Sequence, residues 1–230
     1  MTDAEQGPVD TFIEARLRAL LRSLGQSVAH DLGGPAQKAA AFAEMLREDL
    51  GSELGRDAEE SLHCLETSVA QLTAGLARLA LWCRLPEEPA GFVDEPLGDL
   101  LSRASGLRSG LVWSCQESAA PIACDPGLLA LLLAELLHNA ASYAPGEVPL
   151  VEWDPGHGVL TIRDRGPGLT EDQRSLATIP FRRFVGATEA PGAGLGLAIA
   201  QRIAQMHGAA LTLSDGAPGL VAEIRFERRG

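Results

Sequence analysis

The chain has 230 residues, 46% of them hydrophobic, which is enough for one large domain or two modest ones with apolar cores of their own. Its formal net charge of −12 opposes binding to nucleic-acid phosphates and to anionic lipid, so neither is an expected partner. The most apolar run, residues 128–137, contains Glu135 and is about half of the ~20 residues that a membrane-spanning helix needs.

The N-terminus and the cysteines indicate the compartment. Residues 1–10 are polar and acidic, whereas a secretory signal is basic and then apolar. The cysteines have no Cys-x-x-Cys spacing and no histidine at a metal-ligand interval: Cys64, Cys83, Cys115 and Cys124. Neither a disulfide framework nor a zinc site is predicted. We therefore expect a cytoplasmic protein without a membrane span.

The first predicted element is a long helix. Steps of three and four residues separate its apolar side chains: Ile13, Leu17, Leu20, Leu24, Val28, Phe42, Leu46 and Leu50. Pro35 interrupts this pattern, so we expect the helix to bend there.

A second helix with a longer apolar seam follows. Its seam runs over three heptads: Leu62, Leu65, Val69, Leu72, Leu76, Leu79 and Cys83. Between the helices, Gly51 and Gly55 are suited to end the first and Asp57 to cap the second, which predicts an antiparallel hairpin in residues 1–86. Two helices cannot bury both seams by themselves. A second copy would complete a four-helix bundle across a twofold axis, so we predict a homodimer.

The sequence changes character after the hairpin. Pro86 and Pro89 mark a linker, taken as residues 87–93, before a mixed α/β region over 94–230. Helices are predicted at 94–106, 126–143 and 194–207, and strands at 110–115, 148–153, 158–164, 210–214 and 220–226. The whole chain is therefore predicted to be α+β, with a helical hairpin followed by a sheet layered against helices.

His30 is the first residue that could carry chemistry. It lies two positions, or roughly 200° of helix, from the seam positions Val28 and Leu32, and should face solvent. Its ring nitrogen can act as a nucleophile, while the neighbouring Asp31 can orient the ring and accept its proton. An ordinary surface histidine would give the same local pattern.

Glu135 and Asn139 form a second candidate pair on the apolar helix over 126–143. They are one helical turn apart, so a carboxylate and a carboxamide share one face. Such a pair could hold Mg²⁺ against nucleotide phosphates. A solvent-facing polar pair beside a core helix is the structural alternative.

Two glycine-rich segments complete the set. After the strand predicted at 158–164, Asp164 is followed by Gly166 and Gly168; a carboxylate there can accept a hydrogen bond from an adenine amine. Residues 192–196 lead into the last helix, where backbone amides and the positive helix end can bind phosphate. No Gly-Lys-Ser/Thr follows, so this segment is not a P-loop.

Together, these segments resemble the catalytic core of two-component sensor histidine kinases over nearly all of residues 15–226. The segment from His30 to Pro35 resembles the phosphoacceptor box, and residues 42–50 are similar to kinases of the phytochrome type. Four further segments resemble the nucleotide-binding boxes in order: the asparagine box at 135–143, the first glycine box at 164–168, the phenylalanine box at 180–181 and the second glycine box at 192–197.

The resemblance implies a dimerisation and phosphotransfer hairpin joined to a Bergerat-type ATP-binding sandwich. His30 would attack the γ-phosphate of ATP with Asp31 as the base, and the phosphoryl group would pass to an aspartate of a response-regulator receiver domain. A separate sensor protein or domain would supply the stimulus. Asn139, with Glu135, would bind Mg²⁺, and Asp164 would read adenine. The remaining nucleotide contacts would come from Gly166, Gly168, Phe181, Gly192, Gly194, Leu195 and Gly196.

Three positions depart from the family pattern. Glu135 stands where asparagine is usual and resembles the general base of related ATPases and serine kinases. Ser142 replaces a basic residue near the phosphates, and Gly34 replaces a polar residue that serves dephosphorylation of the regulator. Two alternatives therefore stay open: a kinase-like phosphotransfer or scaffold protein with a degenerate ATP site, and an ATPase or serine kinase that depends on Glu135.

Overall fold

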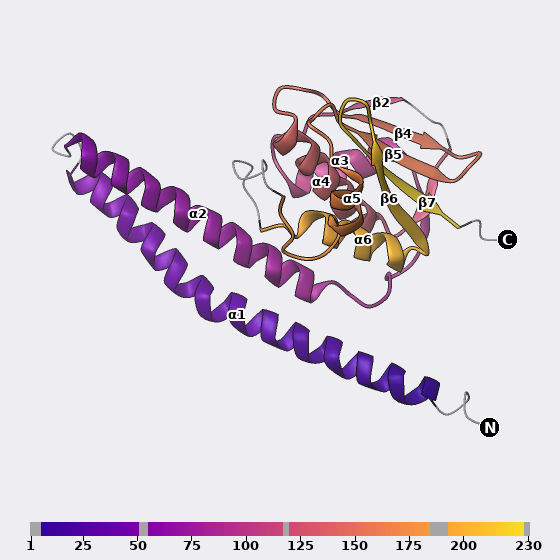
Figure 1. Cartoon of the computed structure of the whole chain (residues 1–230), viewed down its shortest axis with the longest axis horizontal. Coiled ribbons are helices and arrows are strands. Elements are labelled where there is room, and N and C mark those ends of the chain that lie inside the picture. The colour runs from indigo at the N-terminus through magenta and orange to yellow at the C-terminus, as the bar shows by residue number, and fades with distance from the viewer. Residues whose placement is uncertain (1–5, 51–54, 117–119, 185–192, 228–230) are drawn as a thin grey trace. The chain divides into compact units, whose positions relative to one another are not determined.

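The computed structural model of the chain describes residues 6–50, 55–116, 120–184 and 193–227, with the backbone alone for residues 6–15, 17 and 18. The chain divides into two compact units, Met1–Leu85 and Pro86–Gly230 (Figure 1). None of the helices in the described residues is both long and apolar enough to cross a bilayer.

The first unit is a helical hairpin of α1 (Gln6–Leu50) and α2 (Arg56–Arg84). Pro35 lies inside α1, which continues through it, although proline offers no amide to the carbonyl four residues earlier. The prediction that Asp57 caps α2 was wrong. Gly55 is the N-cap and Asp57 lies in the first turn, where its carboxylate still faces the positive helix end. The predicted helix terminator Gly51 lies outside the described residues.

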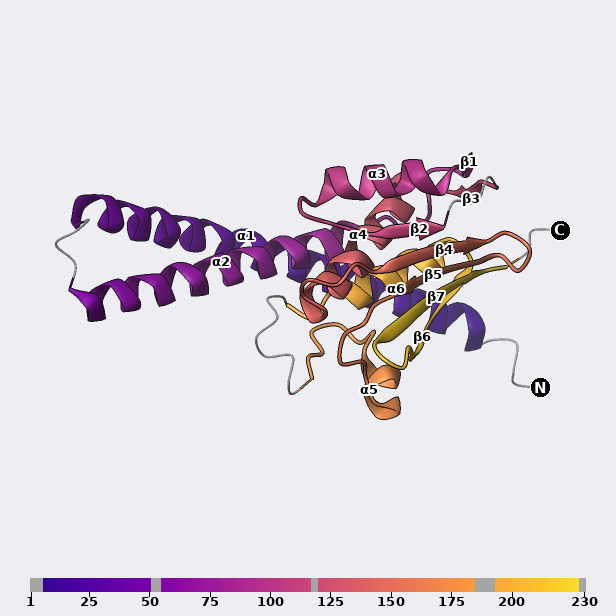
Figure 2. The ribbon, with the colours of Figure 1, turned by 90° about the horizontal axis from the view of Figure 1, so that it is seen from above.

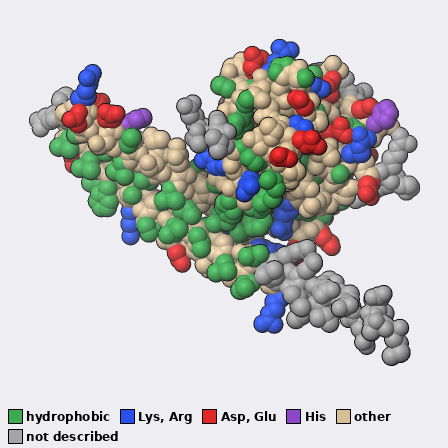
Figure 3. Space-filling view, in the orientation of Figure 1, with side chains coloured by type: hydrophobic (Ala, Val, Ile, Leu, Met, Phe, Trp, Pro, Cys, Tyr) green, Lys and Arg blue, Asp and Glu red, His purple; other side chains and the backbone are tan. Residues whose placement is uncertain are grey.

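The hairpin buries only part of its apolar seams. On α2 the buried positions are seven residues apart: Leu62, Val69, Leu76 and Cys83. The alternate seam positions Leu65 and Leu72 are 45% and 49% exposed. On α1, Leu24 and Phe42 are among the exposed large side chains, and hydrophobic side chains gather along the hairpin in the face shown in Figure 3. A single hairpin thus leaves several large apolar side chains of its seams exposed.

The second unit contains a five-stranded mixed sheet of order β2-β4-β5-β7-β6. Its strands are β2 (Ser114–Gln116), β4 (Leu150–Asp154), β5 (Val159–Arg163), β6 (Ala209–Asp215) and β7 (Leu220–Phe226). β2 pairs with β4 in parallel, and the other pairs are antiparallel. The smaller elements are the antiparallel pair β1 (Val93–Glu95) and β3 (Ile122–Cys124), and the short helix α5 (Glu171–Leu176).

Three helices cover one face of this sheet: α3 (Leu97–Leu107), α4 (Pro126–Tyr143) and α6 (Gly196–Met206) (Figure 2). α4 is buried on nearly every side, because it packs against α3 and α6 as well as the sheet. Leu129, Leu133 and Leu137 are fully buried along it. The described architecture confirms the predicted α+β fold, a helical hairpin followed by an α/β domain with a mixed sheet.

Several predicted boundaries shift. The helix over 126–143 is confirmed at the same residues, but the helix predicted from residue 94 begins at Leu97, because residues 93–95 form β1. The strand predicted at 110–115 is Ser114–Gln116. β1, β3 and α5 were not predicted, since their three to six residues are too short for a periodic pattern.

Candidate functional site

His30 lies on α1 with 89% of its side chain exposed, as its offset from the seam predicts. Its Nδ1 is 3.1 Å from Oδ1 of Asp31, whose side chain is 75% exposed. Because a carboxylate only accepts hydrogen bonds, this contact places the hydrogen on Nδ1 and leaves Nε2 with its lone pair. The pair therefore presents an oriented nucleophilic nitrogen to solvent.

A pocket of about 640 Å³, counting space that opens to solvent, lies in the second unit. Parts of its wall are formed by α4, the end of β5 with the turn after it, the segment after α5 and the start of α6. The lining residues are Asn139, Tyr143, Asp164, Pro167, Gly168, Leu169, Ala177, Arg182, Arg183, Phe184, Gly194, Gly196, Leu197 and Leu220. Its walls are largely apolar with a few polar groups, a composition typical of small-molecule sites.

Asp164 is a buried polar group of this pocket that several backbone hydrogen bonds hold in place. Its side chain is 7% exposed directly after β5. Oδ1 accepts the backbone N–H groups of Gly166 at 2.9 Å and Leu220 at 3.0 Å, and the Asp164 amide donates to the Leu220 carbonyl at 3.0 Å. Oδ2 makes no hydrogen bond to any described residue. One oxygen fixes the carboxylate, and the other can accept a hydrogen bond from a ligand.

Glycines allow the backbone to close around Asp164. A Cβ on Gly166 would lie 2.9 Å from the carbonyl oxygen of Tyr143. Gly219 has φ +99°, and a Cβ there would collide with the backbone of Asp164 itself. Side chains cannot occupy either position without moving the carboxylate. Sequence analysis missed Gly219, because its Gly-x-Pro-Gly context reads as an ordinary turn between β6 and β7.

The start of α6 forms another part of the wall. Gly194 has φ +68°, and its carbonyl accepts the amide of Phe181 at 2.9 Å. A Cβ on Gly194 would lie 2.7 Å from the carbonyl oxygen of Arg182. Leu195 is fully buried as the N-cap, and Gly196 opens the helix and lines the pocket. The predicted Gly192 lies outside the described residues.

Four of the predicted nucleotide- and metal-binding residues that the structure describes do not line the pocket: Glu135, Gly166, Phe181 and Leu195. Glu135 is 4% exposed, with Oε1 3.8 Å from Nη1 of Arg108, and does not line the pocket, whereas Asn139 one turn later does. Phe181 is 57% exposed and also lies outside the lining. Within the described residues, no group of three His, Cys, Asp or Glu side chains could hold a metal ion.

The structure adds lining residues that sequence analysis did not assign. Tyr143 lies one turn beyond Asn139 on the same face of α4, a spacing that could have indicated it. Arg182 and Arg183 also line the pocket. They supply positive charge at the wall, whereas the neutral Ser142 does not line the pocket and its Oγ lies 3.4 Å from Nδ1 of His138.

Comparison with known proteins first identifies the class of the second unit. Residues 124–229 match the family described as histidine kinase-, DNA gyrase B- and HSP90-like ATPases. Full-length ShkA in complex with AMPPNP superposes with a TM-score of 0.62 at 19% identity, over 90% of this chain and 47% of that one. The histidine kinase AdeS of Acinetobacter baumannii gives a TM-score of 0.56 at 17% identity, over 87% and 98%. These two structures support the fold.

Curated relatives then narrow the class. The signal transduction histidine-protein kinase/phosphatase MprB of Mycobacterium sp. (strain KMS) is 30% identical over 221 residues, or 88% of this chain and 43% of MprB. The C4-dicarboxylate transport sensor protein DctB of Pseudomonas aeruginosa is 26% identical over 248 residues, or 96% and 40%. The chain spans less than half the length of these relatives. It belongs to the two-component sensor histidine kinases as a catalytic core.

Proposed function

We propose that this chain binds ATP in the Asp164 pocket, phosphorylates His30 and passes the phosphoryl group to an aspartate of a response-regulator receiver domain. The observation that best supports this proposal is the Asp164 carboxylate. Two backbone amides hold its Oδ1, and its Oδ2 can accept a hydrogen bond from a ligand in the glycine-walled pocket. The ATPase family match and the histidine kinase relatives support this proposed function.

Adenine recognition would rest on the direction of one hydrogen bond. The exocyclic amine of adenine can donate a hydrogen bond to Oδ2 of Asp164. Guanine carries a carbonyl oxygen at the same ring position, and this negatively polarised acceptor would be repelled by the carboxylate. The Tyr143 ring and the Leu220 side chain, which line the same pocket, could enclose the base.

The phosphates would lie toward Asn139 and the arginines. The carboxamide oxygen of Asn139 is suited to Mg²⁺, whose other ligands would be phosphate and water oxygens, because no ready-made cluster of acidic ligands exists among the described residues. When bound, Mg²⁺ would neutralise charge on the phosphates. Arg182 and Arg183 would provide the positive charge that Ser142 lacks.

Phosphoryl transfer would use the exposed His30–Asp31 pair. Nε2 attacks the γ-phosphorus, a phosphorus–nitrogen bond forms, and the bond to the bridging oxygen breaks to release ADP. The phosphorylated ring is positively charged, and Asp31 accepts the Nδ1 proton or shares it. When a receiver carboxylate takes the phosphoryl group, the phosphorus–nitrogen bond breaks and the imidazole ring loses its positive charge.

A homodimer is part of this proposal. Leu65 and Leu72 on α2, with Leu24 and Phe42 on α1, remain largely exposed along the seams of one hairpin. A second hairpin would cover these side chains in a four-helix bundle. His30 would still face outward, because it is offset from the seam.

One labelling experiment tests the function. The protein is incubated with Mg²⁺ and γ-labelled ATP, and His30→Ala is compared with His63→Ala, a second exposed histidine of the same hairpin. We expect an acid-labile, alkali-stable label that disappears in His30→Ala and persists in His63→Ala. Label of equal amount in both variants, or an acid-stable label, would contradict the proposal.

The alternatives predict other outcomes in the same experiment. A scaffold with a degenerate site would bind no nucleotide and take no label. A Glu135-dependent ATPase would release phosphate in His30→Ala but not in Glu135→Gln. The burial of Glu135 beside Arg108, away from the lining of the pocket, gives this last alternative less support.

A further inference from the structure

Residues 86–92, here called the strap, are held along their length by the second unit. Nη2 of Arg202 donates to the carbonyl of Pro86 at 3.4 Å. The amide of Ala90 donates to Oδ2 of Asp125 at 2.9 Å. The Phe92 ring meets the ring of His207 edge to face, with centroids 5.4 Å apart. The strap, which covers most of the linker predicted at 87–93, is therefore held at its start, middle and end.

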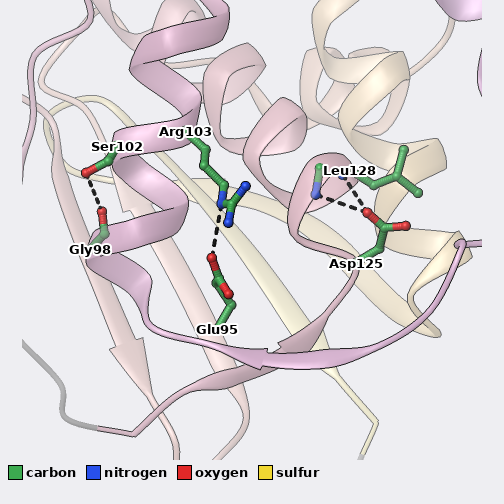
Figure 4. A network of polar contacts seen from close by, with 7 residues as sticks. Glu95, Gly98, Ser102, Arg103, Asp125 and Leu128 are labelled. Carbon is green, nitrogen blue, oxygen red and sulfur yellow. Dashed lines mark hydrogen bonds and ion pairs between the residues drawn. The ribbon is translucent and has the colours of Figure 1, made fainter.

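Asp125 serves both the strap and helix α4. Its Oδ1 accepts the amides of Gly127 at 3.0 Å and Leu128 at 3.1 Å, which caps the helix (Figure 4). Its Oδ2 accepts the Ala90 amide, so the two oxygens have separate partners. A side chain with a single acceptor oxygen could not satisfy both.

His207 fixes the other side of this contact. It is 5% exposed, with Nε2 accepting the Asp125 amide at 3.1 Å and Nδ1 donating to the Ile203 carbonyl at 2.8 Å. The His207 ring also contacts the Phe226 ring, with centroids 6.5 Å apart. The Phe226 ring in turn contacts the Trp153 ring, with centroids 5.8 Å apart. The strap is thus tied to the start of α4, the end of α6 and the sheet.

Docking of the strap leaves a short connection to the hairpin. Helix α2 ends at Arg84, Leu85 is its C-cap, and Pro86 is already bonded to Arg202. If the strap detached, about seven more residues would become extensible, adding up to about 23 Å at ~3.3 Å per residue. The docked strap therefore restricts the tether between the two units to about two residues.

We propose that the strap is a latch, and that Asp125 and His207 are positioning residues that keep the tether short while the pocket phosphorylates His30. This inference rests on the proposed function. Once a tether is longer than the span it bridges, effective concentration falls roughly as the −3/2 power of its length, so lengthening it from about two to about nine residues lowers the effective concentration by up to about tenfold. The rate of His30 phosphorylation falls accordingly, while the pocket itself is unchanged.

Asp125→Asn in the full chain tests the latch. Its single carbonyl oxygen can cap α4 or accept the Ala90 amide, but not both. Asp99→Asn is the control, because it removes one negative charge from an exposed residue in the first turn of α3. Phe92→Ala is an independent second variant, since it removes the ring contact with His207 and leaves Asp125 intact. Amide exchange at Ala90, ATP affinity and the rate of His30 labelling are measured for each.

We expect amide exchange at Ala90 about fivefold faster or more in Asp125→Asn, with labelling slowed between about twofold and tenfold and ATP affinity unchanged. Phe92→Ala should shift labelling in the same direction, and Asp99→Asn should match the wild type. Unchanged exchange at Ala90, or faster exchange with normal labelling, would overturn the latch. A wild-type protein that binds ATP but takes no label would instead overturn the proposed function, and the positioning role with it.

Discussion

At the scale of single residues, Asp164 has the most constrained geometry in the pocket. Two backbone amides hold Oδ1, and glycines at 166 and 219 allow the chain to close around the carboxylate. Its carboxylate therefore does not need to reorganise when a ligand binds, which favours a directional hydrogen bond.

Asp164→Asn should weaken ATP binding by about tenfold to a hundredfold, because Oδ1 can still accept both amides while the Oδ2 acceptor becomes a donor. Titration calorimetry with ATP and Mg²⁺ measures the effect. Asp215→Asn is the matched control, since that exposed carboxylate bonds only a turn amide in the described structure. Equal affinities for the wild type and Asp164→Asn would disprove the role of Asp164.

Cys124 gives a residue-scale prediction for alkaline pH. Burial, with a smaller effect of nearby Glu95, raises the pKa of its thiol to about 12. As pH rises, the thiol ionises in the unfolded chain before it ionises in the folded protein. The contribution of the Cys124 thiol to the free energy of unfolding is therefore complete below pH 9 and declines as pH rises toward 12. At pH 8, iodoacetamide should modify the exposed Cys64 and spare Cys124 until the protein unfolds. Mass spectrometry of the alkylated peptides checks this, and rapid modification of Cys124 in the folded protein would contradict it.

The chemistry-bearing residues could be predicted from sequence only in part. Asp164 and Asn139 were found because each lies next to a strong local pattern, a strand end and an apolar helix. Gly219 and Leu220 come from a distant hairpin, and no local signal links them to Asp164. Glu135 shares the helix face of Asn139, but periodicity could not show that it is buried beside Arg108.

At the scale of elements, Arg47 of α1 and Glu66 of α2 connect the two helices of the hairpin. Nε and Nη2 of Arg47 donate to the two carboxylate oxygens of Glu66 at 2.7 and 2.6 Å. The hydrogen bonds from Arg47 lower the pKa of Glu66. A bidentate pair of this kind fixes the register of the helices more than a single ion contact would.

Glu66→Gln should destabilise the hairpin at neutral pH and make it less sensitive to acid. A lowered folded pKa means that the pair contributes above the ordinary pKa of glutamate and that this contribution is lost as pH falls through the folded value. Thermal unfolding at pH 7 and pH 3, with the exposed Glu60→Gln as the control, measures the difference. A drop in Tm at pH 3 as large as the drop at pH 7 would count against this interaction.

Element boundaries followed from the sequence where a long periodic pattern existed. Helix α4 was predicted at its observed residues because leucine and alanine fill 11 of its 18 positions and Asp125 precedes Pro126 at its start. β1 and β3 could not be predicted, because each is three residues long and owes its pairing to a partner about 30 residues away. The capping box formed by Thr170 and Gln173 is a local sequence signal for α5, which apolar periodicity alone does not reveal.

At the scale of the whole molecule, the exposed apolar side chains of the hairpin seams predict self-association. Leu72→Glu places a charge at a seam position that is 49% exposed in one chain but would be buried in a four-helix bundle. We expect this variant to be a monomer by light scattering where the wild type is a dimer. Leu107→Glu, at an exposed leucine of α3, is the control. A wild-type monomer, or a dimer unaffected by Leu72→Glu, would exclude this interface.

The central claim is that a pocket formed by residues 139–220 delivers phosphorus to a histidine on α1. Mapping of the phosphoryl group by mass spectrometry under alkaline conditions, after incubation with ATP and Mg²⁺, tests it most directly. We predict modification of the peptide that contains His30 in the wild type, and its loss in both His30→Ala and Asp164→Asn. A phosphoryl group on another residue, or modification of His30 at the wild-type level in Asp164→Asn, would contradict the account.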